Sequence, residues 1–388
     1  MSAGRPALGV VVAGGGTGGH LFPGIAVAQR FAAKIAGARL LFVGTGRPFE
    51  SAAVDRAGFA HHAVAVEGIK GRGWKKALAA AFKVPRALLE SMRLLARFRP
   101  HLIFGVGGYA SAPTVAAGWL TGKAVVLQEQ NLLPGIANRI LSPLAQRVYV
   151  SFPETAAHFP RRKVRVCGNP VRREVIDAAK RAAGRRNGRL TVLILGGSQG
   201  AHGINTAVVD ALAHIEHRSR LRFIHQTGEA DRAGVRAAYA EAGIEADVRA
   251  FFHDVGRIFG EADLVICRAG ATTVAELTAI GKAVVFVPFP HAADDHQTKN
   301  AASLARRGAA EMIVEAELTG AGLARKIDNF IQCSEALQTL ARRARQFGRP
   351  EAADAIVDDC LQLLAEKGVW TEGRGQRTED RRQKTEDR

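Results

Sequence analysis

The chain has few of the features that mark secreted, metal-binding or membrane-spanning proteins. Its cysteines stand far apart, at positions 167, 267, 333 and 360, and include no Cys-x-x-Cys pair. This spacing argues against a disulfide framework or a cysteine metal site and favours reduced thiols in a cytoplasmic protein. No apolar run approaches the roughly 20 residues that span a bilayer, and the first residues lack a basic-then-apolar signal segment.

Acidic residues are scarce relative to basic ones. The 388 residues include 54 Lys and Arg but only 36 Asp and Glu, for a formal net charge of +18. Such a balance attracts nucleic acid, anionic membranes or anionic substrates. Aromatic residues make up only 6% and do not interleave with the basic ones, and no nucleic-acid-binding module is recognisable. The charge therefore favours a membrane surface or an anionic substrate over nucleic acid.

Apolar runs of strand length alternate with helical patterns, which is typical of parallel α/β sheets. In the first half we predict strands at residues 8–13, 39–43, 102–106, 124–127 and 147–150. In the second half we predict them at residues 191–195, 221–225, 248–251, 264–267, 283–287 and 311–314. The length accommodates two domains of ordinary size, which we expect to join near residues 161–187.

Three glycine-rich loops each follow a predicted strand directly. They are residues 14–20 (GGGTGGH), 105–109 (GVGGY) and 196–200 (GGSQG). A strand that turns through glycines into a helix presents unpaired backbone N–H groups and the positive end of a helix dipole. Both favour phosphate. We therefore expect two α/β domains that bind a phosphate-bearing ligand with loops in both halves.

The first loop fits the G-x-G-x-x-G dinucleotide fingerprint but lacks the acid that accompanies it. A nicotinamide enzyme places Asp or Glu at the end of the second strand, whereas residues 42–46 read FVGTG. This argues against a dehydrogenase. His20 would lie at a helix N-terminus, where the dipole favours the neutral imidazole. It is our candidate general base, the alternative being a histidine that only caps the loop.

A second candidate site follows the predicted strand at 264–267. Arg268 and the start of the next helix can hold a diphosphate, and Glu276 can accept hydrogen bonds from both ribose hydroxyls, unless it is an ordinary solvated residue. Gln297 and Asn300 supply amides of the kind that read sugar hydroxyls. No Asp-x-Asp metal clamp is present, so we predict neither a metal nor a cofactor.

One stretch, residues 69–100, is rich in lysine and arginine and almost free of acids. Trp74, Leu78 and Phe82 recur four apart and so share one face of a helix, with lysines beside it. Such a helix lies on an anionic bilayer surface, or else its apolar face packs into a domain core. Pro85 should end this helix or start a new one.

Taken in order, the motifs resemble one known family, the undecaprenyldiphospho-muramoylpentapeptide β-N-acetylglucosaminyltransferases of bacterial peptidoglycan synthesis. The motifs are GGGTGGHLFP (14–23), GVGGY (105–109), EQN (129–131), GNPVR (168–172), GGSQGA (196–201) with Asn205, CRAG (267–270) with Glu276, and DHQTKN (295–300). Any single motif is weak, but the ordered set is specific and extends over most of the chain.

The resemblance implies an α/β protein with two Rossmann-like domains facing a cleft, the GT-B glycosyltransferase fold. Residues 1–165 would form a membrane-associating domain that binds the acceptor, with helix 345–367 packing back on it. Residues 166–344 would bind the donor, and residues 368–388 would be a disordered charged tail. The protein would be peripheral, on the cytoplasmic face of the inner membrane, with that anionic surface as a partner and no nucleic acid.

The implied reaction transfers N-acetylglucosamine from UDP-N-acetylglucosamine, with inversion, to the C4 hydroxyl of undecaprenyl-diphospho-N-acetylmuramoyl-pentapeptide (lipid I to lipid II). His20 would be the catalytic base. Donor-binding residues would be Thr17, Gly18, Asn131, Arg172, Ser198, Gln199, Phe252, Arg268, Glu276 and Gln297. Acceptor-binding residues would be Gly15, Gly16, Gly19, Gly107, Gly108, Tyr109 and Asn169. The membrane patch would comprise Trp74, Lys75, Lys76, Leu78, Phe82 and Lys83.

Two positions depart from the family pattern. Gln128 stands where histidine is frequent, so we assign it no catalytic part, and His296 replaces the first of two glutamines, which leaves Gln297 as the sugar contact. Three other functions remain open: a glycosyltransferase with another lipid acceptor, a UDP-sugar epimerase on the same fold, and a non-catalytic basic protein that binds nucleic acid or membrane. The last would leave Arg268 and Glu276 unexplained.

Overall fold

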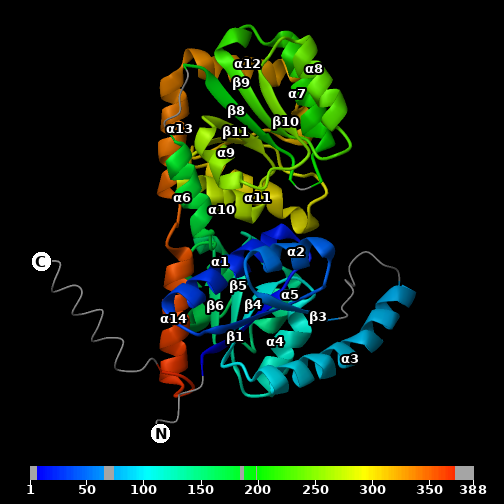
Figure 1. Ribbon diagram of the computed structural model, residues 1–388, viewed down its shortest axis with the longest axis vertical. Coiled ribbons are helices and arrows are strands. Elements are labelled where there is room, and N and C mark those ends of the chain that lie inside the picture. Colours follow the sequence, from blue (N-terminus) through cyan, green and yellow to red (C-terminus); the bar gives the residue numbers. More distant parts are fainter. Residues whose placement is uncertain (1–6, 65–73, 184–187, 198, 372–388) are drawn as a thin grey trace, which may run out of the picture. The chain divides into compact units, whose positions relative to one another are not determined.

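The computed structural model describes residues 7–64, 74–183, 188–197 and 199–371. Its contacts divide the chain into two compact units, coloured along the sequence in Figure 1. Unit 1 consists of Met1–Gln128, Ile136–Tyr149 and Asp354–Arg388, and unit 2 of Glu129–Gly135 and Val150–Ala353. The domain boundaries expected from the sequence stay predictions.

The first sheet has seven strands in the order β3-β2-β1-β4-β5-β6-β7. They are β1 (Gly9–Gly14), β2 (Arg39–Gly44), β3 (Ala60–Ala63), β4 (Leu102–Gly107), β5 (Ala124–Glu129), β6 (Arg147–Val150) and β7 (Val164–Val166). β1 pairs in parallel with both β2 and β4, so the strand order reverses between β1 and β4. In open α/β sheets, ligands bind at the carboxyl ends of the strands beside such a reversal.

The central strands are apolar on both faces because helices flank this sheet (Figure 1). Val10, Val11, Ile103 and Phe104 are fully buried. The helices of unit 1 are α1 (Gly18–Lys34), α2 (Pro48–Arg56), α3 (Trp74–Phe98), α4 (Ser111–Leu120), α5 (Ile136–Leu141) and α14 (Ala352–Glu366).

The C-terminal helix α14 packs onto unit 1 through ion pairs and a buried hydroxyl. Arg30 of α1 pairs with Asp354, and Lys34 pairs with Asp358. The hydroxyl of Tyr149, which is fully buried, donates a hydrogen bond of 2.7 Å to Asp359. Burial, with the neighbouring Cys360 and Asp359, holds the pKa of Tyr149 well above its ordinary value.

The second sheet has six strands in the order β10-β9-β8-β11-β12-β13. They are β8 (Leu190–Leu195), β9 (Leu221–Gln226), β10 (Ala246–Arg249), β11 (Leu264–Cys267), β12 (Ala283–Phe286) and β13 (Glu311–Met312). The strand order reverses between β8 and β11, which pair in parallel. Unit 2 therefore has its own switch point, equivalent to the one between β1 and β4.

Helices flank this second sheet as well (Figure 1). They are α6 (Arg173–Ala182), α7 (His202–His214), α8 (Arg232–Glu241), α9 (Val255–Glu261), α10 (Ala271–Ile280), α11 (His296–Ala305), α12 (Gly320–Gln332) and α13 (Ser334–Gln346). Short 3₁₀ turns lie between these elements at Pro153–His158, Arg161–Lys163, Arg218–Arg220, Ala293–Asp295 and Glu315–Glu317.

The sequence predictions of strands agree with the structure except at the sheet edges. Every predicted strand overlaps an observed one, although β10 begins and ends two residues earlier than expected. The edge strands β3 and β7 were not predicted. Their sequences, AHHA and VRV, lie partly exposed and lack the continuous apolar run that marks a buried strand.

The expectation that Pro85 ends a helix is wrong, because α3 continues through it. A proline inside a helix removes one backbone hydrogen bond and crowds the preceding turn. Packing against α4 offsets this cost: Ala87 and Leu95 are buried, and the hydroxyls of Ser91 and Thr114 lie 3.3 Å apart. Tertiary contact here outweighs local helix propensity. The tail after residue 371 lies outside the described residues.

Candidate active site

In unit 1 the first two glycine-rich loops touch each other at the switch point between β1 and β4. A Cβ placed on Gly14 would lie 2.6 Å from the carbonyl oxygen of Gly107, and one on Gly108 would lie 2.8 Å from that of Gly15. All of these except Gly15 have positive φ angles, so larger residues would be both strained and crowded. Most of the predicted acceptor residues therefore come together in one place.

His20 lies in the first turn of α1, beside both loops. Its Nδ1 is 3.2 Å from the hydroxyl oxygen of Thr17, the residue that precedes the helix. On its other side, a Cβ at Gly107 would lie 3.2 Å from the His20 ring and 3.3 Å from the amide nitrogen of Asn138. The imidazole is half-buried, so a bound ligand could reach it while the loops hold its orientation.

In unit 2 the central feature is an ion pair between Arg172, which precedes α6, and Glu276 of α10. The two side chains approach to 3.3 Å. Burial raises the pKa of Glu276 above its ordinary value, and the charge and hydrogen bond of Arg172 oppose that rise. The sequence predicted both residues as donor-binding. The structure brings them together, and the carboxylate is too buried for an ordinary solvated helix residue.

Arg268 follows β11 and is held from several directions. It forms an ion pair with Glu315, and its guanidinium donates to the carbonyls of Val287 and Pro288 at 3.2 and 3.1 Å. Its guanidinium carbon also lies 5.3 Å from the centre of the Phe289 ring. A diphosphate at this position would meet an arginine whose direction is already fixed.

Gln297 lies in the first turn of α11 and holds two loops together. Its Oε1 accepts hydrogen bonds from the backbone N–H groups of Ala269, at 3.2 Å, and Phe289, at 3.0 Å. Asn300, one turn later, donates to the carbonyl of Ala269 and to Oδ1 of Asn131, both at 3.3 Å. The predicted donor residues Asn131 and Gln297 are therefore linked by hydrogen bonds through Asn300 and Ala269, the residue that follows Arg268.

Gln226 is a candidate site residue that the sequence did not reveal. At the end of β9, its amide donates to the carbonyl of Gly197 at 2.7 Å and accepts from the N–H of Phe252 at 2.9 Å. It thus ties the third glycine-rich loop to the predicted uracil-binding segment. Gln199 is exposed in that loop, whereas Ser198 lies outside the described residues. A lone glutamine after an apolar strand carries no motif, which is why it was missed.

Tyr109 and Asn169, two further predicted acceptor residues, differ in their surroundings. Tyr109 is 43% exposed on unit 1, and Asn169 is buried in unit 2, where neither amide atom has a hydrogen-bond partner among the described residues. The predicted membrane patch lies in the first half of α3, and its side chains are outside the described part of the chain. Glu50 of α2, also missed, contacts the first glycine-rich loop.

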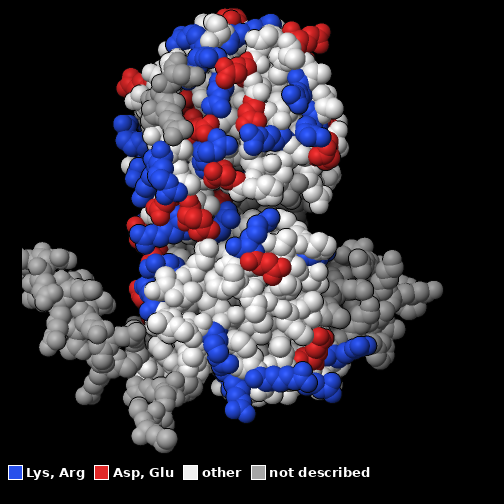
Figure 2. Space-filling view, viewed as in Figure 1, with Lys and Arg blue, Asp and Glu red and all other residues white. Residues whose placement is uncertain are grey.

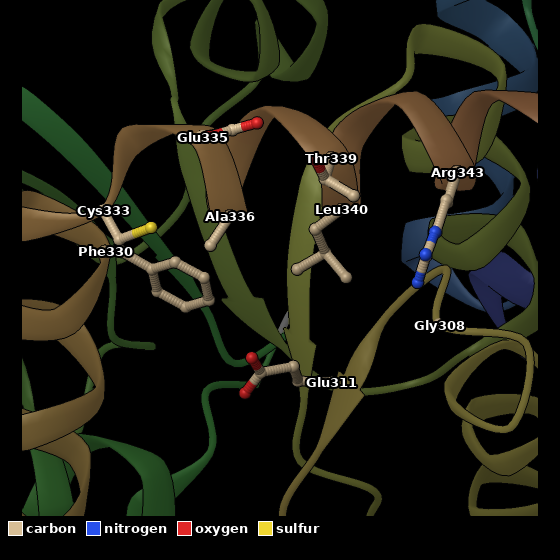
Figure 3. A pocket seen from close by; sticks show the side chains of 9 residues that line it. All are labelled: Gly308, Glu311, Phe330, Cys333, Glu335, Ala336, Thr339, Leu340 and Arg343. Atoms are coloured by element: carbon tan, nitrogen blue, oxygen red, sulfur yellow. The ribbon is translucent and has the colours of Figure 1, made fainter.

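One hollow of unit 2, about 360 Å³ in volume, contains none of the predicted residues. Figure 3 shows it between α13, with Thr339, Leu340 and Arg343, and Glu311 of β13. β13 is the edge strand of the sheet, away from the switch point. We therefore leave this hollow out of the candidate site. Within the described ranges, no group of three or more His, Cys, Asp or Glu could hold a metal ion.

Comparison with known proteins identifies the class. Residues 10–150 match the glycosyltransferase family 28 N-terminal domain, and residues 191–356 match the glycosyltransferase family 28 C-terminal domain. The protein is thus a glycosyltransferase of the two-domain α/β class. This confirms the fold class and the enzyme class predicted from the motifs.

The relatives narrow the class to one family. The chain is 45% identical to the UDP-N-acetylglucosamine–N-acetylmuramyl-(pentapeptide) pyrophosphoryl-undecaprenol N-acetylglucosamine transferase of Myxococcus xanthus over 92% of this chain and 93% of that protein. It is 44% identical to the protein of that name from Syntrophus aciditrophicus over 92% and 98%. The chain belongs to this family of N-acetylglucosaminyltransferases, as the motifs predicted.

Solved structures agree. The crystal structure of Acinetobacter baumannii MurG is 32% identical and superposes with a TM-score of 0.73, covering 90% of this chain and 98% of that one. The UDP-GlcNAc 2-epimerase of Neisseria meningitidis, solved with UDP-GlcNAc, has a TM-score of 0.66 but only 12% identity over 92% and 100%. The second likeness shows a shared fold and gives no support to an epimerase activity.

Proposed function

We propose that this chain transfers N-acetylglucosamine from UDP-N-acetylglucosamine to the C4 hydroxyl of an undecaprenyl-diphospho-N-acetylmuramoyl-pentapeptide. The observation that carries this proposal is the 45% identity to a transferase of that name over 92% of the chain, a span that includes both units. An acceptor other than this lipid would have to use the same loops, and none of the relatives named above supports one.

Unit 2 binds the donor in this proposal. The Glu276 carboxylate, held by Arg172, accepts hydrogen bonds from the ribose hydroxyls. Arg268 and the start of α10 face the diphosphate, where a cation and a helix N-terminus offset the charge that develops on UDP as it leaves. Gln297 and Asn131 contact the sugar. The segment at Phe252 contacts uracil through groups other than the Phe252 N–H, which Gln226 already occupies.

Unit 1 binds the acceptor, with its diphosphate at the two touching glycine-rich loops. The C4 hydroxyl oxygen attacks the anomeric carbon in one displacement, and the bond from that carbon to the β-phosphate oxygen breaks on the opposite face. His20 accepts the hydroxyl proton, and UDP leaves with the bonding electrons. A cavity of about 710 Å³ next to Thr45, lined on α3 by Arg86 and Arg93 as well as Leu89 and Glu90, gives this unit room for a large acceptor.

A membrane surface is the third partner in the proposal. None of the described helices is long and apolar enough to cross a bilayer. The basic and apolar residues at the start of α3, Trp74 to Lys83, would rest on anionic lipid headgroups at the cytoplasmic face. On the face shown in Figure 2, both signs of charge are interspersed over unit 2, so that face presents no uniformly basic patch there.

The test of the activity is transfer of label. Donor labelled in the N-acetylglucosamine should yield a labelled lipid-linked disaccharide with the muramoyl-pentapeptide lipid as acceptor, and no labelled product with diacylglycerol. Label on diacylglycerol, or conversion of the donor to its 2-epimer without any acceptor, would replace the proposed function by one of its rivals. Sedimentation with vesicles tests the membrane partner: Lys75→Glu with Lys76→Glu should reduce binding to anionic vesicles and leave UDP affinity unchanged.

A further inference from the structure

Two charged side chains at the start of α2 grip the backbone of one glycine in the first glycine-rich loop, one on each of its two flanking peptide groups. The Glu50 carboxylate accepts a hydrogen bond from the N–H of Gly16. The guanidinium of Arg47, the residue before α2, donates to the carbonyl of the same Gly16 at 3.1 Å. One glycine thus has both of its backbone groups fixed by side chains more than 30 residues away in sequence.

The Glu50 carboxylate is enclosed by groups that donate hydrogen bonds to it and by glycines that leave room for it. Its Oε2 accepts from the N–H of Thr45 at 2.9 Å, and its Oε1 accepts from the Thr45 hydroxyl at 2.8 Å. A Cβ on Gly15 or on Gly44 would come within 2.9 Å of the carboxyl group, so both positions need glycine to leave room for it. Glu50 itself is only 5% exposed. A carboxylate so enclosed ties the end of β2 to the loop after β1.

The grip controls where His20 lies. Gly16 has a φ of +97°, and Thr17, the next residue, adopts an extended conformation before α1 begins. The carbonyl of Thr17 accepts from the His20 N–H, and the Thr17 hydroxyl lies 3.2 Å from the His20 ring. Rotation of the Gly16 peptide would therefore move Thr17 and the first turn of α1. The Glu50 charge also disfavours a phosphate at the Gly16 N–H, which directs an acceptor diphosphate toward other groups of the loops.

We infer that Glu50, assisted by Arg47, is a positioning residue of the acceptor site: it fixes the glycine-rich loop so that His20 faces the acceptor, without touching the reacting atoms. The role of His20 rests on the proposed function, but the grip on the loop does not. Its consequences can therefore be measured both with and without substrate.

The first experiment replaces Glu50 by Gln, which keeps the shape but cannot accept from both N–H groups. We expect turnover with the lipid-linked acceptor to fall ~10–100-fold, the loss expected when hydrogen bonds to a charged acceptor disappear. The affinity for UDP, which Arg268 and Glu276 of unit 2 are proposed to hold, should change far less than turnover does. In a His20→Ala background the same change should cost less than about threefold, because residues that act as one unit are not additive. Full turnover in Glu50→Gln, or a fully additive loss, would overturn the inference.

The second experiment needs no activity. Hydrogen exchange of the Gly16 and Thr17 amides in the unliganded protein should speed up about tenfold or more in Glu50→Gln. The matched control is Asp354→Asn, which breaks the ion pair with Arg30 at the far end of the same helix α1 and should leave loop exchange and turnover as they were.

Thr45→Val, which removes only the hydroxyl contact, should give an intermediate exchange rate and serves if Glu50→Gln folds poorly. Unchanged exchange in both Glu50→Gln and Thr45→Val would refute the grip. Faster exchange in these variants, together with no transfer of N-acetylglucosamine by the wild type, would support the contact but count against the proposed function.

Discussion

The guanidinium of Arg172 donates a hydrogen bond of 3.3 Å to the carboxylate of Glu276, 104 residues further along the chain. Arg172 precedes α6, and Glu276 lies on α10, the helix that follows β11 at the switch point of the second sheet. The arginine offsets part of the cost of burying the acid. The carboxylate can thus stay ionised where a ribose would meet it.

Arg172→Met should therefore weaken UDP binding even though the carboxylate remains. Without the cation, burial favours the protonated acid, which accepts hydrogen bonds less well. We expect a loss of ~10–100-fold in UDP affinity by calorimetry, corresponding to about 1.5–3 kcal/mol. Arg173→Met is the matched control, because this neighbouring side chain is exposed and forms an ion pair with the exposed Asp177 of the same helix. Equal losses in both variants would mean that the Arg172–Glu276 pair has no special part in binding.

The pH dependence of UDP binding follows from the raised pKa of Glu276. Because burial moves this pKa above its ordinary value of 4.5, the carboxylate takes up a proton at a higher pH than an exposed glutamate does. Affinity should be highest at neutral pH and above, and should fall as the solution becomes weakly acidic. In Glu276→Gln the affinity should be lower throughout and lose this acid limb. The acid limb persisting in the variant would assign the titration to another group.

His20→Ala should lower turnover by ~10²–10⁴ with UDP affinity unchanged. The reason is that the imidazole lies between the two glycine-rich loops of unit 1, whereas Arg268 and Glu276, proposed to hold the UDP moiety, belong to unit 2. Steady-state kinetics with saturating acceptor measure the turnover number. His61→Ala, on the edge strand β3, should change neither quantity. Wild-type turnover in His20→Ala would remove this residue from the mechanism.

A buried histidine should make the protein sensitive to acid. His225 of β9 lies 3.0 Å from Asn205 and 3.2 Å from the hydroxyl of Tyr239, and burial lowers the pKa of His225 to about 3. In the unfolded chain His225 has an ordinary pKa and takes up a proton below about pH 6.5. In the folded protein the same side chain stays neutral at that pH. Above that pH, His225 therefore does not lower the free energy of unfolding. Below it, this one histidine should lower the free energy of unfolding by about 1.4 kcal/mol per pH unit.

Denaturant titrations between pH 7 and pH 5 measure this slope. His225→Gln should be less stable at neutral pH, because Tyr239 and Asn205 lose a partner, but its slope should be smaller by about one proton. The exposed His158→Gln should keep the wild-type slope. An unchanged slope in His225→Gln would show that other groups cause the acid sensitivity.

The parts of the fold that the sequence predicted are those where burial leaves a pattern. Strands such as β1 and β8 lie in the middle of their sheets and need continuous apolar runs, so their positions could be read from residues 8–13 and 191–195. The edge strands β3 and β7 have one open side and no such run, and backbone pairing alone places them. The passage of α3 through Pro85 depends on its packing against α4, which local sequence does not encode.

The residues of the candidate site likewise divide into those that the sequence could predict and those that it could not. The glycine-rich loops and Arg268 directly follow strands, and Glu276 lies in the helix after β11, so their place near the carboxyl ends of the strands could be predicted. Glu50 and Gln226 contact segments that are distant in the sequence. Each is a single polar residue that links two separate loops, and this role is visible only in the folded structure. Nothing in their sequence neighbourhood distinguishes them from ordinary surface residues.

The most direct test of the account is UDP release from UDP-N-acetylglucosamine, with and without a short-chain lipid-linked muramoyl-pentapeptide, in the wild type and in Glu276→Ala. We predict release that depends on the acceptor in the wild type and that needs far more donor, or fails, in the variant. Release that ignores the acceptor, or that Glu276→Ala leaves unchanged, would contradict both the proposed transfer and the proposed donor site.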